Sequence, residues 1–121
     1  MYDETSDSTL RILHLEDSTV DHELVRRSLQ RSGLACTLEH VESLDDFRHA
    51  IDTASFDAIV ADYRLRGFTA LDAWDLIKSQ QNAPPFILLS GAIGESAAVA
   101  AIKLGMSDYL QKDHLAKLAP V

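Results

Sequence analysis

At 121 residues the chain is long enough for one domain with a single core and too short for two. Hydrophobic residues make up 46% and charged residues 25%, as in ordinary globular proteins, and no apolar run approaches the ~18 residues of a membrane helix. The net charge of −8 argues against direct nucleic-acid binding, which requires a basic surface.

The first ten residues, "MYDETSDSTL", are acidic and polar and do not resemble a secretory signal, so we expect a cytoplasmic protein. We expect residues 1–9 to form a flexible segment and residues 10–121 to form the domain. The single cysteine, Cys36, excludes an internal disulfide. Its apolar surroundings predict a small core side chain rather than a reactive thiol.

The first half of the chain alternates between short apolar runs and amphipathic stretches. A strand is predicted at 11–15 ("RILHL") and is followed by a helix over 18–33, in which Val25 and Leu29 lie on one face. Gly33 is a natural helix end. A second strand is predicted at 37–41 ("TLEHV").

The alternation continues to the end of the chain. Ser43 is a good N-cap for a helix over 43–55. The remaining elements are predicted strands at 57–61, 86–90 and 108–112, and predicted helices at 69–80, 95–105 and 114–121. Nearly continuous apolar runs indicate strands that are buried on both faces. The pattern therefore predicts an α/β fold in which a doubly wound, five-stranded parallel sheet has helices on both faces.

Polar residues follow the predicted strands at their carboxyl ends. Glu16 and Asp17 follow the first strand, Asp62 the third, Ser90 ends the fourth and Lys112 ends the fifth. Carboxyl ends of parallel strands meet at one edge of the sheet, where ligands bind in open α/β folds. Clustered carboxylates repel one another unless a cation joins them, and all-oxygen ligands suit Mg²⁺. A carboxylate nucleophile, a metal ion, a lysine and a hydroxyl group are together the functional groups that phosphoryl transfer to an aspartate uses.

Each of these residues also has an ordinary structural interpretation when it is taken singly. Asp62 is compatible with a loop acid or a helix cap, and Asp17 with a cap of the first helix. Ser90 is compatible with a turn before Gly91, and Lys112 with a solvated charge. These interpretations do not explain why four predicted strands all carry such polar residues at their carboxyl ends.

The motifs "LED", "DYRL", "LLSG" and "DYLQK", in this order at successive strand ends, resemble the receiver domains of two-component response regulators. The resemblance extends from about Leu10 to about Leu118. It implies a flavodoxin-like strand order, 2-1-3-4-5. The few residues that remain after His114 predict a last helix that is short or truncated. The resemblance also implies a phosphoacceptor signalling domain rather than an enzyme, although the domain promotes its own phosphorylation and dephosphorylation and an attached catalytic domain is compatible with it.

The resemblance implies a role for each site residue. Asp62 is the expected phosphoacceptor, and Mg²⁺, for which Mn²⁺ can substitute, is held directly by Asp17 and Asp62 and by the backbone carbonyl of Arg64, with Glu16 acting mainly through water. Two further residues, Ser90 and Lys112, are expected to contact the phosphoryl group. A switch is expected to pair Ser90 with Tyr109, whose other interpretation is a half-buried strand tyrosine.

Four features depart from the family pattern or lie outside it. Asp113 occupies the place of a proline that usually follows the lysine, and Arg66 stands where proline is common in the loop after the acceptor. Arg64 is long enough to lie over the phosphate and to affect its lifetime. The histidines fall on different predicted elements and do not predict a site; His14, inside the first strand, is expected to be partly buried.

The resemblance implies a histidine kinase or His phosphotransfer protein as donor and an output domain or protein as receiver of the signal, through the surface of residues 95–121; homodimers are also compatible with it. Because few residues follow His114 and Pro120 is among them, we expect one module of a longer protein. A degenerate receiver that only docks partners is the alternative. A phosphohydrolase of the haloacid dehalogenase type is disfavoured, since Arg64 stands where its second aspartate is required.

Overall fold

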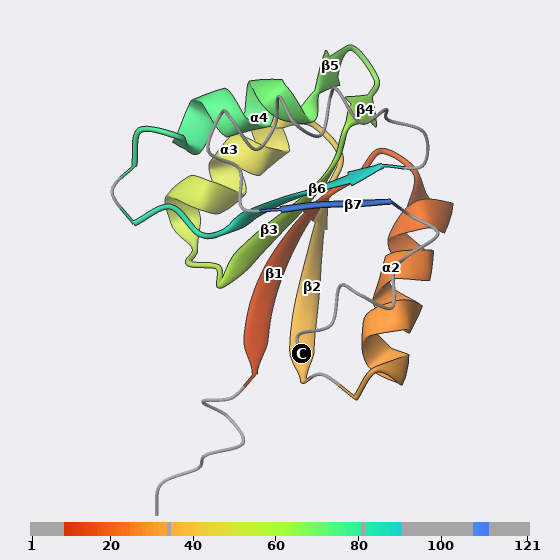
Figure 1. Cartoon of the computed structure of the whole chain (residues 1–121). Coiled ribbons are helices and arrows are strands. Elements are labelled where there is room, and N and C mark those ends of the chain that lie inside the picture. Colours follow the sequence, from red (N-terminus) through yellow and green to blue (C-terminus); the bar gives the residue numbers. More distant parts are fainter. Residues whose placement is uncertain (1–8, 34, 81, 91–107, 112–121) are drawn as a thin grey trace, which may run out of the picture.

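The main sheet contains five parallel strands in the order β2-β1-β3-β6-β7, which confirms the predicted α/β fold and strand order (Figure 1). The structure, a computed structural model, describes residues 9–33, 35–80, 82–90 and 108–111. The strands are β1 (Leu10–Leu15), β2 (Cys36–Val41), β3 (Ala58–Asp62), β6 (Phe86–Ser90) and β7 (Asp108–Gln111). The segments 1–8, 91–107 and 112–121, with the helices predicted at 95–105 and 114–121, lie outside the described residues.

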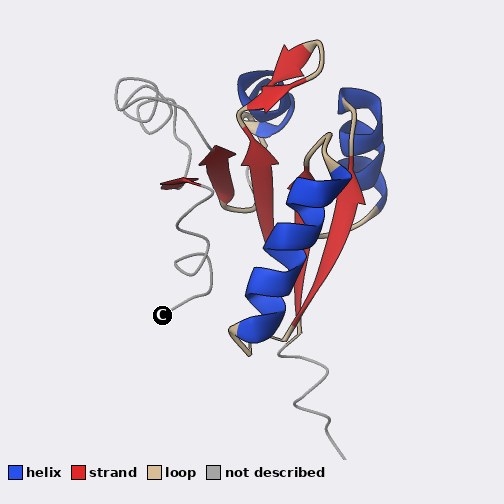
Figure 2. Cartoon of the chain, turned by 90° about the vertical axis from the view of Figure 1, so that its right-hand side faces the viewer, coloured by secondary structure: helices blue, strands red, loops and turns tan. Residues whose placement is uncertain are grey.

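Helices lie on both faces of this sheet (Figures 1 and 2). One face carries α2 (Thr19–Arg31), and the other carries α3 (Leu44–Thr53) and α4 (Ala70–Ile77). In the part of the chain that the structure describes, no helix is long and apolar enough to span a membrane.

Two hydrophobic clusters lie on opposite faces of the sheet because successive strand side chains point in opposite directions. In the smaller cluster, Val25 and Leu29 of α2 pack against three strand residues, Ile12, Val60 and Leu89. The larger cluster lies under α3 and α4 and includes Leu13, Leu15, Phe47, Ala50, Ile59, Ala61, Ala70, Ala73, Ile77, Phe86 and Leu88. The strands are therefore apolar on both sides, as their sequence predicts.

Hydroxyl side chains fix where the described helices begin. Ser18 accepts a hydrogen bond from the amide of Asp21 at 3.2 Å, and Ser43 accepts one from the amide of Asp46 at 3.1 Å. Thr69 and Asp72 form a capping box at the start of α4, so Thr69 precedes that helix instead of belonging to it. Each described helix therefore begins one residue later than predicted, because capping residues flank a helix without being part of it, and each also ends two or three residues earlier than predicted.

A small antiparallel hairpin follows β3, where the sequence predicts only a loop. It consists of β4 (Arg64–Leu65) and β5 (Phe68–Thr69), joined by Arg66 and Gly67. Gly67 has a φ of 81°, a left-handed conformation that glycine adopts without steric penalty. The hairpin returns the chain from the end of β3 to the start of α4.

We predict that the core under α3 is a major source of stability. Phe47 is fully buried, so Phe47→Ala should lower the free energy of unfolding by about 3–5 kcal/mol. Leu24 on α2 is 51% exposed, and Leu24→Ala should change stability by less than about 1 kcal/mol. Urea denaturation of the two variants measures this difference, and equal losses would contradict the assigned core.

Candidate functional site: a carboxylate cluster at the sheet edge

Three carboxylates meet at the carboxyl edge of the sheet. Glu16 and Asp17 directly follow β1, and Asp62 is the last residue of β3, the strand hydrogen-bonded to β1. One carboxylate oxygen from each of the three residues lies within 4.8 Å of the other two. The acids that the sequence singled out are therefore brought together by the pairing of two neighbouring strands.

Burial and backbone hydrogen bonds hold this cluster in place. Glu16 is fully buried, and Asp62 is 6% exposed. The amide of Glu16 donates to the carbonyl of Val41 in β2 at 3.0 Å, and the amide of Ser18 donates to Glu16 Oε2 at 3.3 Å. The site is thus built on strand ends, which are more rigid than a free loop.

Asp17 has a role that differs from helix capping. Ser18, not Asp17, caps α2. The Oδ2 atom of Asp17 instead accepts a hydrogen bond of 2.9 Å from the backbone amide of Arg66, in the turn of the β4–β5 hairpin. The interpretation of Asp17 as the cap of the first helix is therefore wrong, and this carboxylate stays beside Glu16 and Asp62.

Asp62 is also no loop acid, because it belongs to a central strand. It pairs in register with Leu89 of β6, and the next amide, that of Tyr63, donates to the Leu89 carbonyl at 3.0 Å. The carbonyl of Tyr63 then accepts a hydrogen bond of 3.0 Å from the amide of Ala70, the first residue of α4. The backbone on both sides of the cluster is consequently tied to the sheet and to a helix.

The donor chemistry of the cluster fits a hard divalent cation. All three side chains offer oxygen, which Mg²⁺ prefers, and they come close enough to share one ion. Two of the three are buried, where mutual repulsion of negative charges is least screened by solvent. A bound cation would neutralise that repulsion.

The other residues singled out from the sequence are described less fully. Ser90 ends β6 and pairs with Gln111 of β7, so its backbone lies at the same edge as Asp62. Arg64 lies in β4 and Tyr109 in β7, but the side chains of Ser90, Arg64 and Tyr109 are not described. Lys112 and Asp113 lie outside the described residues.

Three histidines, His14, His22 and His40, form a cluster next to Glu16 that sequence reasoning missed. The Nδ1 atoms of His14 and His22 are 2.9 Å apart, and the rings of His22 and His40 are stacked with centroids 4.0 Å apart. His40 Nε2–H donates to the carbonyl of Glu16 at 2.6 Å. His14, which is fully buried, places Nε2 4.0 Å from Glu16 Oε1. The cluster thus connects α2 to the backbone and side chain of Glu16.

The rings of His22 and His40 are oriented for packing against each other rather than for sharing one metal ion. The planes of His22 and His40 differ by only 7°, and a metal ion must lie in the plane of each imidazole that binds it. Two stacked, parallel rings cannot share one ion in this way. The register of β1 and β2, which sets His14 beside His40, is the signal that could have identified the cluster.

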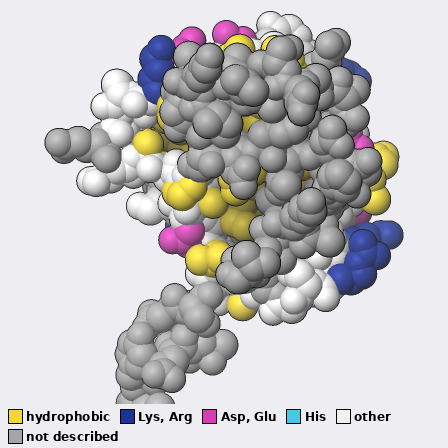
Figure 3. Space-filling view, viewed as in Figure 1, with side chains coloured by type: hydrophobic (Ala, Val, Ile, Leu, Met, Phe, Trp, Pro, Cys, Tyr) yellow, Lys and Arg dark blue, Asp and Glu magenta, His cyan; other side chains and the backbone are white. Residues whose placement is uncertain are grey.

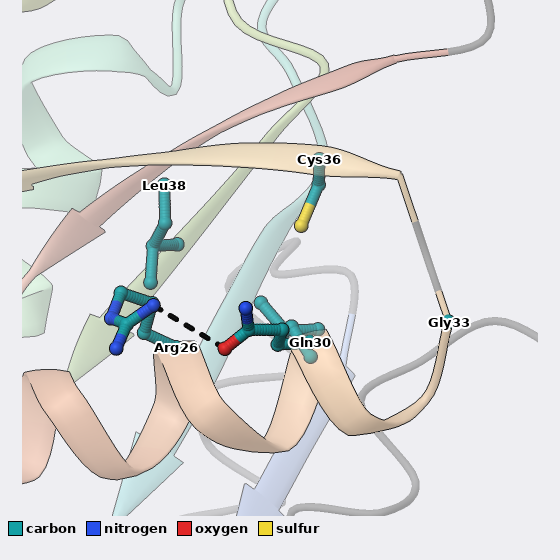
Figure 4. A pocket seen from close by; sticks show the side chains of 6 residues that line it. Arg26, Gln30, Gly33, Cys36 and Leu38 are labelled. Atoms are coloured by element: carbon teal, nitrogen blue, oxygen red, sulfur yellow. Dashed lines mark hydrogen bonds between the residues drawn. The ribbon is translucent and has the colours of Figure 1, made fainter. Parts of the chain in front are cut away.

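A pocket of about 310 Å³ lies at the far end of α2 from the carboxylates (Figure 4). Arg26 and Cys36 line it, together with Leu29, Gln30, Gly33 and Leu38. The Arg26 guanidinium is already bound to Glu23 and to Gln30. Cys36 is half-buried rather than fully buried, and burial raises the pKa of its thiol, which disfavours the reactive thiolate.

We predict that His22 makes stability depend on pH. Burial, and then the proximity of His40, lower the pKa of His22 in the folded protein below its ordinary 6.5. The unfolded chain therefore binds a proton at higher pH than the folded chain, so this contribution to stability is complete above pH 6.5 and is lost as the pH falls below it. Urea denaturation between pH 5 and about pH 7.5 should show a weaker pH dependence in His22→Asn. His49→Asn, an exposed change on α3, is the control, and equal slopes in the two variants would contradict the assignment.

Comparison with curated proteins identifies relatives among bacterial regulators. The transcriptional regulatory protein FixJ of Bradyrhizobium diazoefficiens is 28% identical over 98 residues, which are 81% of this chain and 47% of FixJ. Response regulator MprA of Mycobacterium bovis is 31% identical over 106 residues, which are 86% of this chain and 44% of MprA. The chain spans less than half the length of these relatives.

Solved structures agree with the fold. A signal receiver domain from Vibrio parahaemolyticus superposes with a TM-score of 0.78 at 24% identity, covering 88% of this chain and 84% of that chain. The Mn²⁺-bound form of response regulator Rcp1 superposes with a TM-score of 0.77 at 18% identity, covering 90% and 91%. The model of the response regulator receiver domain family matches residues 12–119. The chain therefore belongs to the response regulator receiver domain family.

Proposed function

We propose that this domain is a cytoplasmic phosphoacceptor in a two-component system, with Asp62 as the acceptor and Mg²⁺ or Mn²⁺ as the required cation. The observation that carries the proposal is the meeting of three carboxylate oxygens within 4.8 Å, one of them from Asp62 on a central strand. Two further findings support the proposal: the chain belongs to the receiver family, and one of its structural neighbours is the Mn²⁺-bound form of Rcp1.

Phosphoryl transfer then proceeds at a carboxylate that the fold holds rigidly. An oxygen of Asp62 forms a bond to phosphorus while the P–N bond to a phosphohistidine of the donor breaks, and the leaving imidazole takes up a proton. A divalent cation held by Asp17, Asp62 and the Arg64 carbonyl, with Glu16 through water, would neutralise charge on the carboxylates and on the transferred group. In the same proposal Ser90 and Lys112 contact the phosphoryl oxygens.

The donor in this proposal is a histidine kinase or a His phosphotransfer protein, and α2 offers a surface on which it can dock. Val20 is 69% exposed and Leu24 is 51% exposed, both in the first half of the helix that begins two residues after Asp17. Figure 3 shows hydrophobic side chains and, below them, Lys and Arg side chains at the right-hand margin, where α2 lies in Figure 1. We name Val20 and Leu24 the α2 apolar surface.

The response to phosphorylation belongs to the same proposal. New contacts of the phosphoryl group with Ser90 and Lys112 bias Tyr109 toward a second position and change the surface of residues 95–121, which signals to an output domain or protein. The curated relatives are longer than this chain, which agrees with one module of a larger protein. Dimerisation through that surface is part of this proposal as well.

The acceptor is tested with Asp62→Asn, which keeps the shape of the side chain and removes its charge. Incubation with acetyl phosphate and Mg²⁺ should label the wild type at Asp62 only, and labelling should be lost in the variant and in excess chelator. In chelator the variant should also be more stable by on the order of 1 kcal/mol, because one of three repelling carboxylates is gone. Asp52→Asn, an exposed change on α3, is the matched control. Labelling of Asp62→Asn at another residue would refute Asp62 as the sole acceptor.

The proposed role of the α2 apolar surface in docking is tested with Val20→Asp. A charge at this exposed apolar position should slow transfer from a phosphorylated donor protein by tenfold or more, which is about 1.4 kcal/mol of binding or activation free energy. Labelling by acetyl phosphate, which needs no protein surface, should stay within twofold of the wild type. Equal slowing with both phosphodonors would place the defect in the site and not in docking.

A further inference from the structure

Arg66 contacts the one carboxylate of the cluster that reaches the surface. Its backbone amide donates to Asp17 Oδ2 at 2.9 Å, and its guanidinium Nε lies 3.8 Å from the same oxygen. The Asp17 side chain is 19% exposed, whereas the Arg66 side chain is 91% exposed. One oxygen of Asp17 therefore has a hydrogen-bond donor fixed by the backbone and a solvent-exposed positive charge beside it.

The hairpin keeps the amide of Arg66 in this position. Arg66 and Gly67 form the two-residue turn between β4 and β5, with Leu65 paired to Phe68. Gly67 has a positive φ and Arg66 does not, which is the pattern of a type II turn. The capping box at Thr69 and the hydrogen bond from the Ala70 amide to the Tyr63 carbonyl anchor both ends of the hairpin.

We propose that Arg66 sets the divalent-cation affinity of the carboxylate cluster through Asp17, as a positioning residue whose two contacts act in opposite directions. The amide strengthens cation binding, because it holds the Asp17 carboxylate beside Glu16 and Asp62 before the cation arrives. The guanidinium weakens cation binding, because a positive charge near Oδ2 repels the incoming ion. This inference rests on the metal site of the proposed function.

The size of the guanidinium effect follows from its exposure. A unit charge about 6 Å from a divalent ion in water, screened by salt with a Debye length of about 8 Å, changes the affinity by roughly threefold. The effect of the amide does not depend on salt in this way, since it acts through the orientation of a side chain. Salt dependence thus separates the two contacts.

The test is a calorimetric titration of the full chain with Mg²⁺, and with Mn²⁺ followed by water-proton relaxation. Arg66→Ala keeps the amide and removes the guanidinium, so it should bind either ion about threefold more tightly than the wild type at about 0.15 M salt, with a larger difference at low salt and a smaller one at high salt. Arg31→Ala is the matched control, because it removes an equal charge from the far end of α2 and should leave the affinity unchanged.

A second variant isolates the amide. Arg66→Pro removes both contacts, and proline is compatible with the first central position of a type II turn. It should bind the cation several-fold more weakly than Arg66→Ala, at low and at high salt. Circular dichroism and urea denaturation check that the hairpin change leaves the fold intact.

The outcomes distinguish this proposal from the metal site on which it rests. Equal affinities of wild type, Arg66→Ala and Arg31→Ala would overturn the role of the guanidinium, and equal affinities of Arg66→Ala and Arg66→Pro would overturn that of the amide, while the metal site stands. No binding by either the wild type or Arg66→Ala would overturn the metal site and this proposal together.

Discussion

The repulsion among three carboxylates at one sheet edge is the constraint around which the described structure is organised. Parallel pairing of β1 with β3 forces Glu16, Asp17 and Asp62 together, and burial of two of them prevents solvent from relieving the repulsion. The fold tolerates this arrangement because hydrophobic clusters on both faces of the sheet fix the strands that carry it. Three carboxylate oxygens held within 4.8 Å of one another form the arrangement on which the proposed cation site rests.

Residues next to the three carboxylates contribute a positive charge and hydrogen-bond donors. Arg66 reaches Asp17 from the hairpin, and His40 donates to the Glu16 carbonyl from β2. The His40 ring stacks on His22 of α2, and the same helix carries the exposed Val20 and Leu24. The surface proposed to receive a phosphodonor and the acids proposed to hold the cation are therefore joined through three stacked or hydrogen-bonded imidazoles.

Local features of the sequence were sufficient for most of the architecture, but not for contacts between distant elements. Glu16, Asp17 and Asp62 directly follow or end apolar runs, so strand direction alone predicts that they meet. The histidine cluster depends on the register of β1 against β2 and on the rotation of α2 about its axis, which spacing along the chain does not reveal. The hairpin was missed because its strands have only two residues each, although Arg66 followed by Gly67 is a turn signal.

The most direct test of the account is a crystal structure of the protein grown with Mn²⁺, with anomalous scattering recorded at the manganese edge. The account predicts one strong peak at about 2.2 Å from oxygens of Asp17 and Asp62, with Glu16 nearby. The absence of a peak among these carboxylates at saturating Mn²⁺, or a dominant peak at the histidine cluster, would contradict it.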